Sequence, residues 1–197
     1  MKEIRENVLL SSLTTFGIGG AARYFTEVQS EAELKEAIGW AKSQGKKFTI
    51  LSGGSNVLVP DGGVDALIVR MVGNSYEVQQ NDVSLWSGTN LLYAIQDSGK
   101  QGLGGWEKLA GIPGSIGGAI RGNAGAFGTE IKDYAIKVEA MHSESLEIRE
   151  FTNEQCEFSY RHSFFKDNPE WIITRIQISL THKSDLWVRE QVEATIA

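Results

Sequence analysis

Cysteine is nearly missing from this sequence of 197 residues, in which Cys156 is the only one. A single cysteine cannot form an internal disulfide, and a reducing compartment is the simplest setting for it. A chain of this length buries about 70% of its unfolded surface, so its core needs no disulfides. The same length fits one domain, or two small lobes that share a ligand.

The chain also lacks an excess of positive charge and any long apolar run. Its net charge is -6 at pH 7, and no cluster of Lys or Arg is present to collect phosphates, which argues against nucleic acid as a main partner. No apolar run approaches the roughly 20 residues that span a bilayer, and no secretory signal pattern opens the sequence. We therefore expect a soluble, cytoplasmic protein without membrane insertion.

Residues with obvious catalytic or metal-binding patterns are scarce as well. The histidines are too scattered for a metal site, so none is predicted, and Cys156 is expected to be a small buried side chain rather than a nucleophile. No serine lies in a G-x-S-x-G elbow, which leaves a hydrolytic triad without support. The histidines in question are His142, His162 and His182, and the serines are Ser55, Ser115 and Ser163.

Glycine, in contrast, is abundant, and it is densest over Lys108–Gly128, KLAGIPGSIGGAIRGNAGAFG. Each glycine inside a regular element costs roughly 0.5–1 kcal/mol relative to alanine, so this density indicates that bare backbone is needed against a large ligand. Pro113 predicts a rigid turn, and Ser115 predicts the cap of a helix over Ile116–Arg121. The N-terminus of that helix would favour a phosphate by about 0.3–1 kcal/mol. The plainer alternative is a loop whose glycines only turn corners.

A second glycine stretch follows a short apolar strand predicted at 48–51. It reads Ser52-Gly53-Gly54-Ser55-Asn56, and its backbone N–H groups and polar side chains suit a pyrophosphate. It lacks the lysine of a P-loop. A loose G-x-G-x-x-A at Gly17–Ala22 is followed by strand-forming residues rather than a helix, so we reject it as a dinucleotide fingerprint.

Hydrophobic periodicity predicts an α+β chain in two lobes, with few signals before residue 13. A capping box at Ser30 opens a helix that ends at Gly45, and a helix from Asn90 is expected to fade at Gly99. Ile136, Val138 and Ala140 are expected on the buried face of one strand. Further strands are predicted at 23–28, 66–72, 76–86 as a hairpin, 146–151 and 172–180, and an amphipathic helix at 185–197. The predicted boundaries are 1–72 for the first lobe, 73–183 for the second and 184–197 for the start of a further domain.

Arg161 is the charged residue that calls for an explanation. It lies in the aromatic segment FSYRHSFFK, Phe158–Lys166, and a guanidinium buried there must be paired or aimed at a ligand anion. One interpretation is an ion pair with a carboxylate at a domain seam. The other is stabilisation of charge that develops on a substrate.

Four segments together are similar to the UDP-N-acetylenolpyruvoylglucosamine reductases, the MurB family of peptidoglycan precursor synthesis. They are TTFGIGGAARYF, LSGGSNVLVPDGG, LAGIPGSIGGAIRGNAGAFG and EFSYRHSFFK, in the order that the family has them. The resemblance implies a two-lobed α+β FAD-binding domain of the vanillyl-alcohol-oxidase-like (PCMH) type. It also implies that NADPH reduces the FAD, which then passes hydride to the enolpyruvyl group of a UDP-sugar substrate to give UDP-N-acetylmuramate.

The resemblance assigns roles to particular residues. Arg161 matches the catalytic arginine that stabilises the charge on the substrate carboxylate, and Tyr160 would be a nearby substrate contact. Ile173 is similar to the backbone contact to the flavin ring. The other cofactor-binding residues that the resemblance implies are Gly53, Gly54, Ser55 and Asn56 for the pyrophosphate and Gly111, Ile112, Pro113, Gly114, Gly117 and Gly118 further along the FAD.

This sequence departs from the family in one respect. The proton-donating serine and the catalytic glutamate of the family belong to a C-terminal substrate domain, and neither segment occurs here; Ser163 imitates the serine motif but belongs to the arginine segment. Because general acid catalysis is worth about 10²- to 10⁴-fold, we expect the FAD-binding portion of a longer enzyme that turns over poorly alone. A non-catalytic FAD-binding module and a related FAD-dependent oxidase remain alternatives, although the oxidase gives no reason for Tyr160-Arg161.

Overall fold

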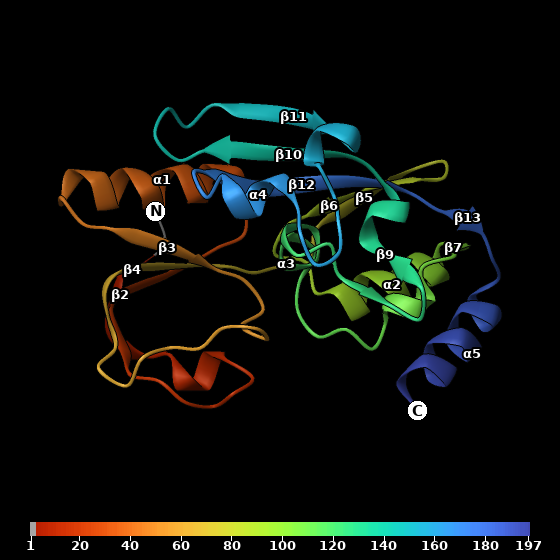
Figure 1. Ribbon diagram of the computed structural model, residues 1–197, viewed down its shortest axis with the longest axis horizontal. Coiled ribbons are helices and arrows are strands. Elements are labelled where there is room, and N and C mark those ends of the chain that lie inside the picture. The colour runs from red at the N-terminus through yellow and green to blue at the C-terminus, as the bar shows by residue number, and fades with distance from the viewer. Residues whose placement is uncertain (1–2) are drawn as a thin grey trace. The chain divides into compact units, whose positions relative to one another are not determined.

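The computed structural model describes residues 3–197, which form two compact units (Figure 1). One unit ends at Gly73 and the other extends from Asn74 to Ala197. Each has its own hydrophobic core, one around Phe25 and Ile68 and the other around Trp106 and Ile176.

The first unit is a four-stranded sheet with a helix packed along it (Figure 1). The strand order is β1-β2-β4-β3; β2, β4 and β3 are parallel, and β1 is antiparallel to β2. The bounds are β1 Arg5–Leu9, η1 Ser11–Leu13 (a 3-10 helix), β2 Ala21–Val28, α1 Glu31–Ser43, β3 Phe48–Leu51 and β4 Val64–Met71.

The helix of the first unit begins and packs as its sequence predicts. The Ser30 side chain accepts a hydrogen bond from Glu33 N at 3.3 Å, which satisfies an amide that the helix leaves unpaired. The periodic apolar residues, Leu34, Ala37, Ile38 and Ala41, are all buried. Strand β1 was not predicted, because it is an edge strand whose residues are mostly exposed and show no apolar alternation.

The second unit is built on a five-stranded antiparallel sheet in the order β11-β10-β12-β6-β5. The sheet strands are β5 Tyr76–Gln79, β6 Asp82–Trp86, β10 Ala135–His142, β11 Ile148–Thr152 and β12 Trp171–Ser179. The helices are α2 Leu91–Lys100, η2 Glu107–Leu109, α3 Ile116–Arg121, η3 Ile131–Asp133, η4 Glu154–Cys156, α4 Phe164–Asp167 and α5 Asp185–Ile196. Two small strand pairs complete it, β7 Leu103–Gly104 with β13 Thr181–His182 and β8 Gly125–Ala126 with β9 Thr129–Glu130.

Two local expectations for the second unit were wrong. Ile136 is 39% exposed rather than buried, because the pairing of β10 with β12 shifts register between Ala135 and Lys137 and turns Ile136 outward. Helix α2 does not fade at Gly99 but continues to Lys100. A Cβ at Gly99 would lie 2.6 Å from Val188 Cγ1, so the missing side chain allows α5 to pack closely on α2.

Helix α5, which the sequence analysis assigned to the start of a further domain, contributes Val188 and Val192 to the core of the second unit. None of the helices in residues 3–197 combines the length and apolar content that a bilayer crossing needs. In the same residues, His, Cys, Asp and Glu side chains form no group of three that could hold a metal ion.

The one cysteine is expected to be chemically inert while the protein is folded. Cys156 is fully buried, and burial raises the pKa of its thiol to about 12. A thiol-specific disulfide reagent at pH 8 should therefore modify a urea-unfolded sample rapidly and leave the folded protein unmodified. Equal reaction rates in the folded and unfolded samples would contradict this prediction.

The raised pKa of the Cys156 thiol also makes stability depend on pH. Since the folded-state pKa is raised, this buried thiol supports folding below about pH 8.5, and its contribution is lost as the pH rises toward 12.

Candidate functional site

The loop after β3 is held in a shape that only glycine permits. Gly54 has φ +68°, and a Cβ there would lie 2.1 Å from Leu13 O. Gly54 O accepts a hydrogen bond from Thr15 N at 3.0 Å, so the 52–56 loop lies directly against the 13–15 segment. The sequence analysis placed a pyrophosphate in this loop, and the structure shows why its backbone is bare.

Several polar groups in this region lack protein partners. Among residues 3–197, no carbonyl accepts a backbone hydrogen bond from the N–H groups of Gly53, Gly54 or Asn56. The buried Thr14 hydroxyl, next to Gly54, has no partner among the same residues either. Gly54 and the Thr14 hydroxyl are buried, and buried polar groups in folded proteins are normally satisfied, so these two groups indicate a loop built to receive hydrogen-bond acceptors from a ligand; Gly53 and Asn56 are exposed, and their N–H groups are open to the same ligand or to water. The sequence analysis missed Thr14, although it lies inside the first resembling segment.

The G-x-G at Gly17–Gly19 serves packing instead of dinucleotide binding. A Cβ at Gly20 would lie 2.3 Å from Asp61 O, and one at Gly19 would lie 2.5 Å from Val59 Cβ. The chain then enters β2 rather than a helix, as expected when the fingerprint was rejected. Exposed apolar side chains gather on the two loops that these glycines bring together: Phe16, Ile18, Val57 and Leu58.

In the second unit, the dense glycines let α3 approach the end of β6. Gly117 N donates to Ser87 O at 2.8 Å, and a Cβ on Gly117 would lie only 1.9 Å from Ser87 Oγ. Gly114, at φ +126°, turns the chain into α3, and its carbonyl accepts from Leu91 N at 3.0 Å. The fold itself therefore explains why Gly114 and Gly117 are glycines, without any ligand.

The N-terminus of α3 does not offer the free amides that we expected for a phosphate. Ile116 N donates to Thr89 O at 2.9 Å, Gly117 N to Ser87 O, and Gly118 N to Ser115 Oγ at 3.4 Å. The helix cap at Ser115 is confirmed, but protein atoms already take the first three amides of the helix. The expectation of a phosphate at this helix end was wrong for that reason.

The other predicted cofactor residues of this unit lie before α3, inside α3 and on strand β12. Ser87 N donates to Thr174 O at 2.9 Å, which brings β12 and Ile173 beside the Gly117 contact. Ile173 pairs with Ala140 of β10, while β6, on the other side, ends at Trp86 opposite Arg175. Gly118 is exposed, and the nearest atom to a Cβ there would be Ser115 Oγ at 3.7 Å. Pro113 is exposed, Ile112 packs against the core, and Gly111 faces Thr195 of α5.

Arg161 is exposed at the tip of a tight turn. Ser159 and His162 exchange two backbone hydrogen bonds of 3.2 and 3.1 Å, so Tyr160 and Arg161 form a two-residue loop, with Arg161 at φ +55°. Tyr160 is 83% exposed, and the Arg161 guanidinium lies 5.9 Å from its ring centroid. Within residues 3–197, no carboxylate pairs with Arg161.

The expected aromatic surroundings of Arg161 were wrong. Phe164 and Phe165 each pack on Phe151 at 5.2 Å between ring centroids, which draws them into the core while the turn projects outward. With no buried charge to compensate, the interpretation of an ion pair inside the protein loses its support.

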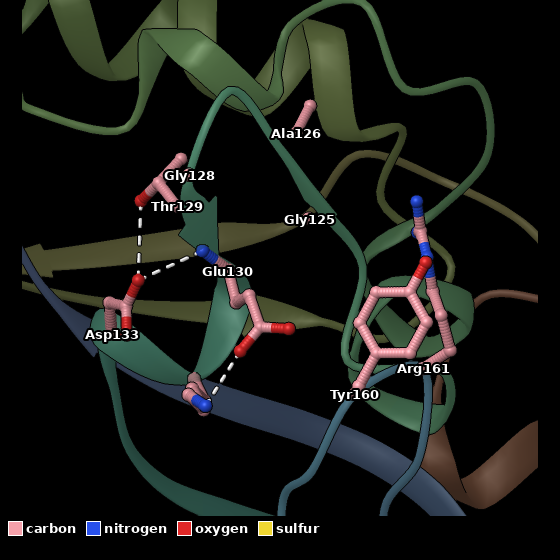
Figure 2. A pocket seen from close by; sticks show the side chains of 9 residues that line it. Gly125, Ala126, Gly128, Thr129, Glu130, Asp133, Tyr160 and Arg161 are labelled. Carbon is pink, nitrogen blue, oxygen red and sulfur yellow. Dashed lines mark hydrogen bonds and ion pairs between the residues drawn. The ribbon is translucent and has the colours of Figure 1, made fainter.

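Arg161 and Tyr160 form one wall of a cavity of about 460 Å³ (Figure 2). Figure 2 shows Glu130 and Asp133 facing them across the β8–β9 hairpin. Both carboxylates are engaged locally: Glu130 pairs with Lys132 at 2.6 Å, and Asp133 accepts from Glu130 N at 2.8 Å. The remaining wall residues are Gly125, Ala126, Gly128 and Thr129.

Comparison with known proteins decides which family this arrangement belongs to. Residues 22–148 match the family described as FAD binding domain. A crystal structure of UDP-N-acetylenolpyruvylglucosamine reductase (MurB) from Thermus caldophilus matches with a TM-score of 0.82 and 31% identity, over 98% of this chain and 68% of that one. The chain belongs to the UDP-N-acetylenolpyruvoylglucosamine reductase family, as its FAD-binding part.

Curated reductases agree with this assignment. The protein from Pseudomonas putida is 37% identical over 183 residues, 90% of this chain and 54% of the relative, and that from Solibacter usitatus is 38% identical over 164 residues, 83% of this chain and 52% of the relative. The chain thus spans about half the length of the curated relatives it matches. A cholesterol oxidase from Brevibacterium sterolicum, at TM-score 0.61 and 12% identity, shares the fold alone.

The family assignment confirms the resemblance inferred from the four sequence segments, and with it the α+β fold of the PCMH type and the FAD cofactor. The residues of this reductase-family chain fit FAD. Its 52–56 loop offers the unpaired amides of Gly53, Gly54 and Asn56, and at the exposed Gly118 the nearest atom to an added Cβ is 3.7 Å away.

Proposed function

We propose that this chain is the FAD-binding portion of an NADPH-dependent reductase that converts UDP-N-acetylenolpyruvoylglucosamine to UDP-N-acetylmuramate. The observation that carries the proposal is the Arg161 guanidinium, which lines a cavity without a carboxylate partner in residues 3–197 of a chain from this family. The left-handed backbone of Arg161 costs on the order of 1–3 kcal/mol, and residues in such conformations cluster at active sites and ligand-binding sites.

We assign the FAD pyrophosphate to Gly53, Gly54, Ser55 and Asn56. The unpaired N–H groups of Gly53, Gly54 and Asn56, together with the unsatisfied Thr14 hydroxyl, support that assignment. Further along the cofactor we place Gly111, Ile112, Pro113, Gly114, Gly117, Gly118 and Ile173. Of these, Gly111 and Gly118 are positions whose lack of a side chain no close protein contact explains, since the nearest atom to an added Cβ is 3.7 Å away at each.

When bound, FAD supplies the hydride, having received it from NADPH. The chain's own part is electrostatic. The planar guanidinium of Arg161 binds the substrate carboxylate through paired hydrogen bonds and stabilises the negative charge that develops there. Tyr160, beside it, lines the approach of the UDP-sugar. The proton-donating serine and the glutamate of the family have no counterpart in this sequence, so we propose that the chain alone turns over slowly.

The proposal predicts that Gly54→Ala weakens FAD binding and lowers the amount of FAD retained. A Cβ would collide with Leu13 O and would strain a residue at positive φ, so the loop that receives the pyrophosphate must deform. We expect FAD affinity to fall at least about tenfold, by analogy with removing one or more hydrogen bonds to a charged group. The measurement is the visible absorption spectrum after added FAD has been removed by gel filtration.

Gly62→Ala is the matched control, since no atom lies within 4 Å of the position that its added methyl group would take and its φ is not positive. Retained flavin in both variants would refute the assignment of the 52–56 loop. A folded but flavin-free unaltered chain would refute the proposal that this portion binds FAD by itself.

A further inference from the structure

Asn123 is a buried polar residue that the proposed chemistry does not use directly. It lies just after α3, is 0% exposed, and has φ +41°, a conformation that asparagine tolerates better than most residues. Its side chain makes two hydrogen bonds. Nδ2 donates to Ser159 O at 2.9 Å, and Oδ1 accepts from Lys132 N at 3.3 Å.

These two bonds connect opposite walls of the cavity. Ser159 begins the turn that carries Tyr160 and Arg161, and Lys132 lies in η3 on the other wall. One side-chain amide therefore sets the distance between the arginine turn and the segment that faces it. Because one partner is a carbonyl and the other an N–H group, the Asn123 amide satisfies both in this orientation and neither if it is flipped.

The neighbouring contacts anchor the rest of the segment but leave the turn to Asn123. Ser163 Oγ donates to Arg121 O at 2.8 Å, and the Arg121 guanidinium donates to Phe165 O. Both bonds hold the chain after the turn. At the turn itself, Lys166 Nζ donates to Arg161 O at 2.6 Å from an exposed side chain, whereas the part-buried bond to Ser159 O comes from Asn123, which is 0% exposed, so solvent weakens it less.

We propose that Asn123 is a positioning residue, which acts by holding the Arg161 turn at the distance that the substrate carboxylate requires. This inference rests on the proposed function of Arg161. A misplacement of about 1 Å can cost about 10²-fold in rate, so a buried anchor for an exposed, strained arginine has a functional reason to exist.

Asn123→Asp tests the proposal, because it keeps the shape and removes the donor to Ser159 O. The FAD-loaded chain is titrated with the UDP-sugar substrate, and the flavin absorbance reports binding. We expect affinity to fall about tenfold or more, and amide hydrogen exchange in residues 159–162 to accelerate. Asn123→Gly keeps the positive φ and removes the side chain, so it should show the same loss of affinity and the same faster exchange. Because it introduces no buried carboxylate, it shows whether the effect of Asn123→Asp comes from misfolding.

Asn168→Asp is the matched control. Asn168 Nδ2 donates to Phe164 O at 2.9 Å, a similar bond outside the cavity wall, so neither the affinity nor the exchange at the turn should change. In an Arg161→Ala background, Asn123→Asp should cause no further loss of affinity, because Asn123 acts through Arg161.

The same loss with and without Arg161, or unchanged exchange in residues 159–162, would overturn the inference. If instead the proposed function is wrong, the measurements give a different set of results. In that case Arg161→Ala alone leaves the affinity unchanged, or the unaltered chain does not bind the substrate, while the exchange measurement still decides whether Asn123 holds the turn.

Discussion

Replacing Arg161 by alanine should slow the oxidation of reduced FAD by the UDP-sugar substrate by about 10²- to 10³-fold, the usual cost of removing one preorganised charge-stabilising donor. The side chain has no carboxylate partner in residues 3–197 and lies at an exposed turn, so its removal leaves no buried charge uncompensated. The folded structure should therefore survive, and the loss should lie in the chemistry. The measurement is a single turnover, in which flavin absorbance returns after the substrate is mixed with FAD-loaded, pre-reduced chain.

Two further variants make this result interpretable. Arg161→Lys retains the charge but loses the planar pair of donors, so we expect it to recover only part of the rate. Arg149→Ala removes another exposed arginine of the same unit, one that stacks 4.7 Å from the Phe151 ring centroid and lies outside the cavity wall. It should leave the rate unchanged. Equal rates for Arg161→Ala and the unaltered chain would remove the arginine from the mechanism.

Much of the secondary structure could be predicted because it depends on local patterns. The Ser30 cap with the apolar face of α1, the apolar strands after it and the Ser115 cap of α3 all have short-range causes that are visible in the sequence. Ile136 and β1 could not be predicted in the same way. A β-bulge depends on the partner strand, and an edge strand with both faces exposed has no apolar alternation to read.

The predictions for the candidate site also succeeded where the cause is local and failed where it depends on tertiary contacts. Glycine density indicated where bare backbone is needed, but the sequence could not show what each glycine faces. The amides at the start of α3 were expected to be free, yet they bond to Ser87, Thr89 and Ser115, two of which lie far back in the chain. Asn123 was missed for a related reason. Its two partners, Ser159 and Lys132, are brought to it only by the tertiary fold.

Gly117 and Gly118 are adjacent in α3 and are expected to respond oppositely to alanine. A Cβ at Gly117 would lie 1.9 Å from Ser87 Oγ and 3.1 Å from Ser87 Cβ, and Ser87 is buried, so the end of β6 must shift. Overpacking of this kind costs about 1–3 kcal/mol. At Gly118 the nearest atom is 3.7 Å away, and alanine should raise the free energy of unfolding by about 0.5–1 kcal/mol through its better helix propensity. Urea unfolding of the FAD-free chain measures both changes.

For Gly118→Ala, the effect on FAD affinity should be opposite to the effect on stability. If its bare Cα is there for the cofactor, Gly118→Ala gives a chain that is more stable without FAD and yet binds FAD at least about tenfold more weakly, because the methyl group keeps the ligand from the backbone. Gly117→Ala, in contrast, should lose stability first and affinity only as a consequence. Stability without FAD and affinity for FAD thus separate a glycine that the fold requires from one that the ligand requires. A Gly118→Ala chain that is more stable and binds FAD as tightly as before would show that the cofactor does not approach α3 at this residue.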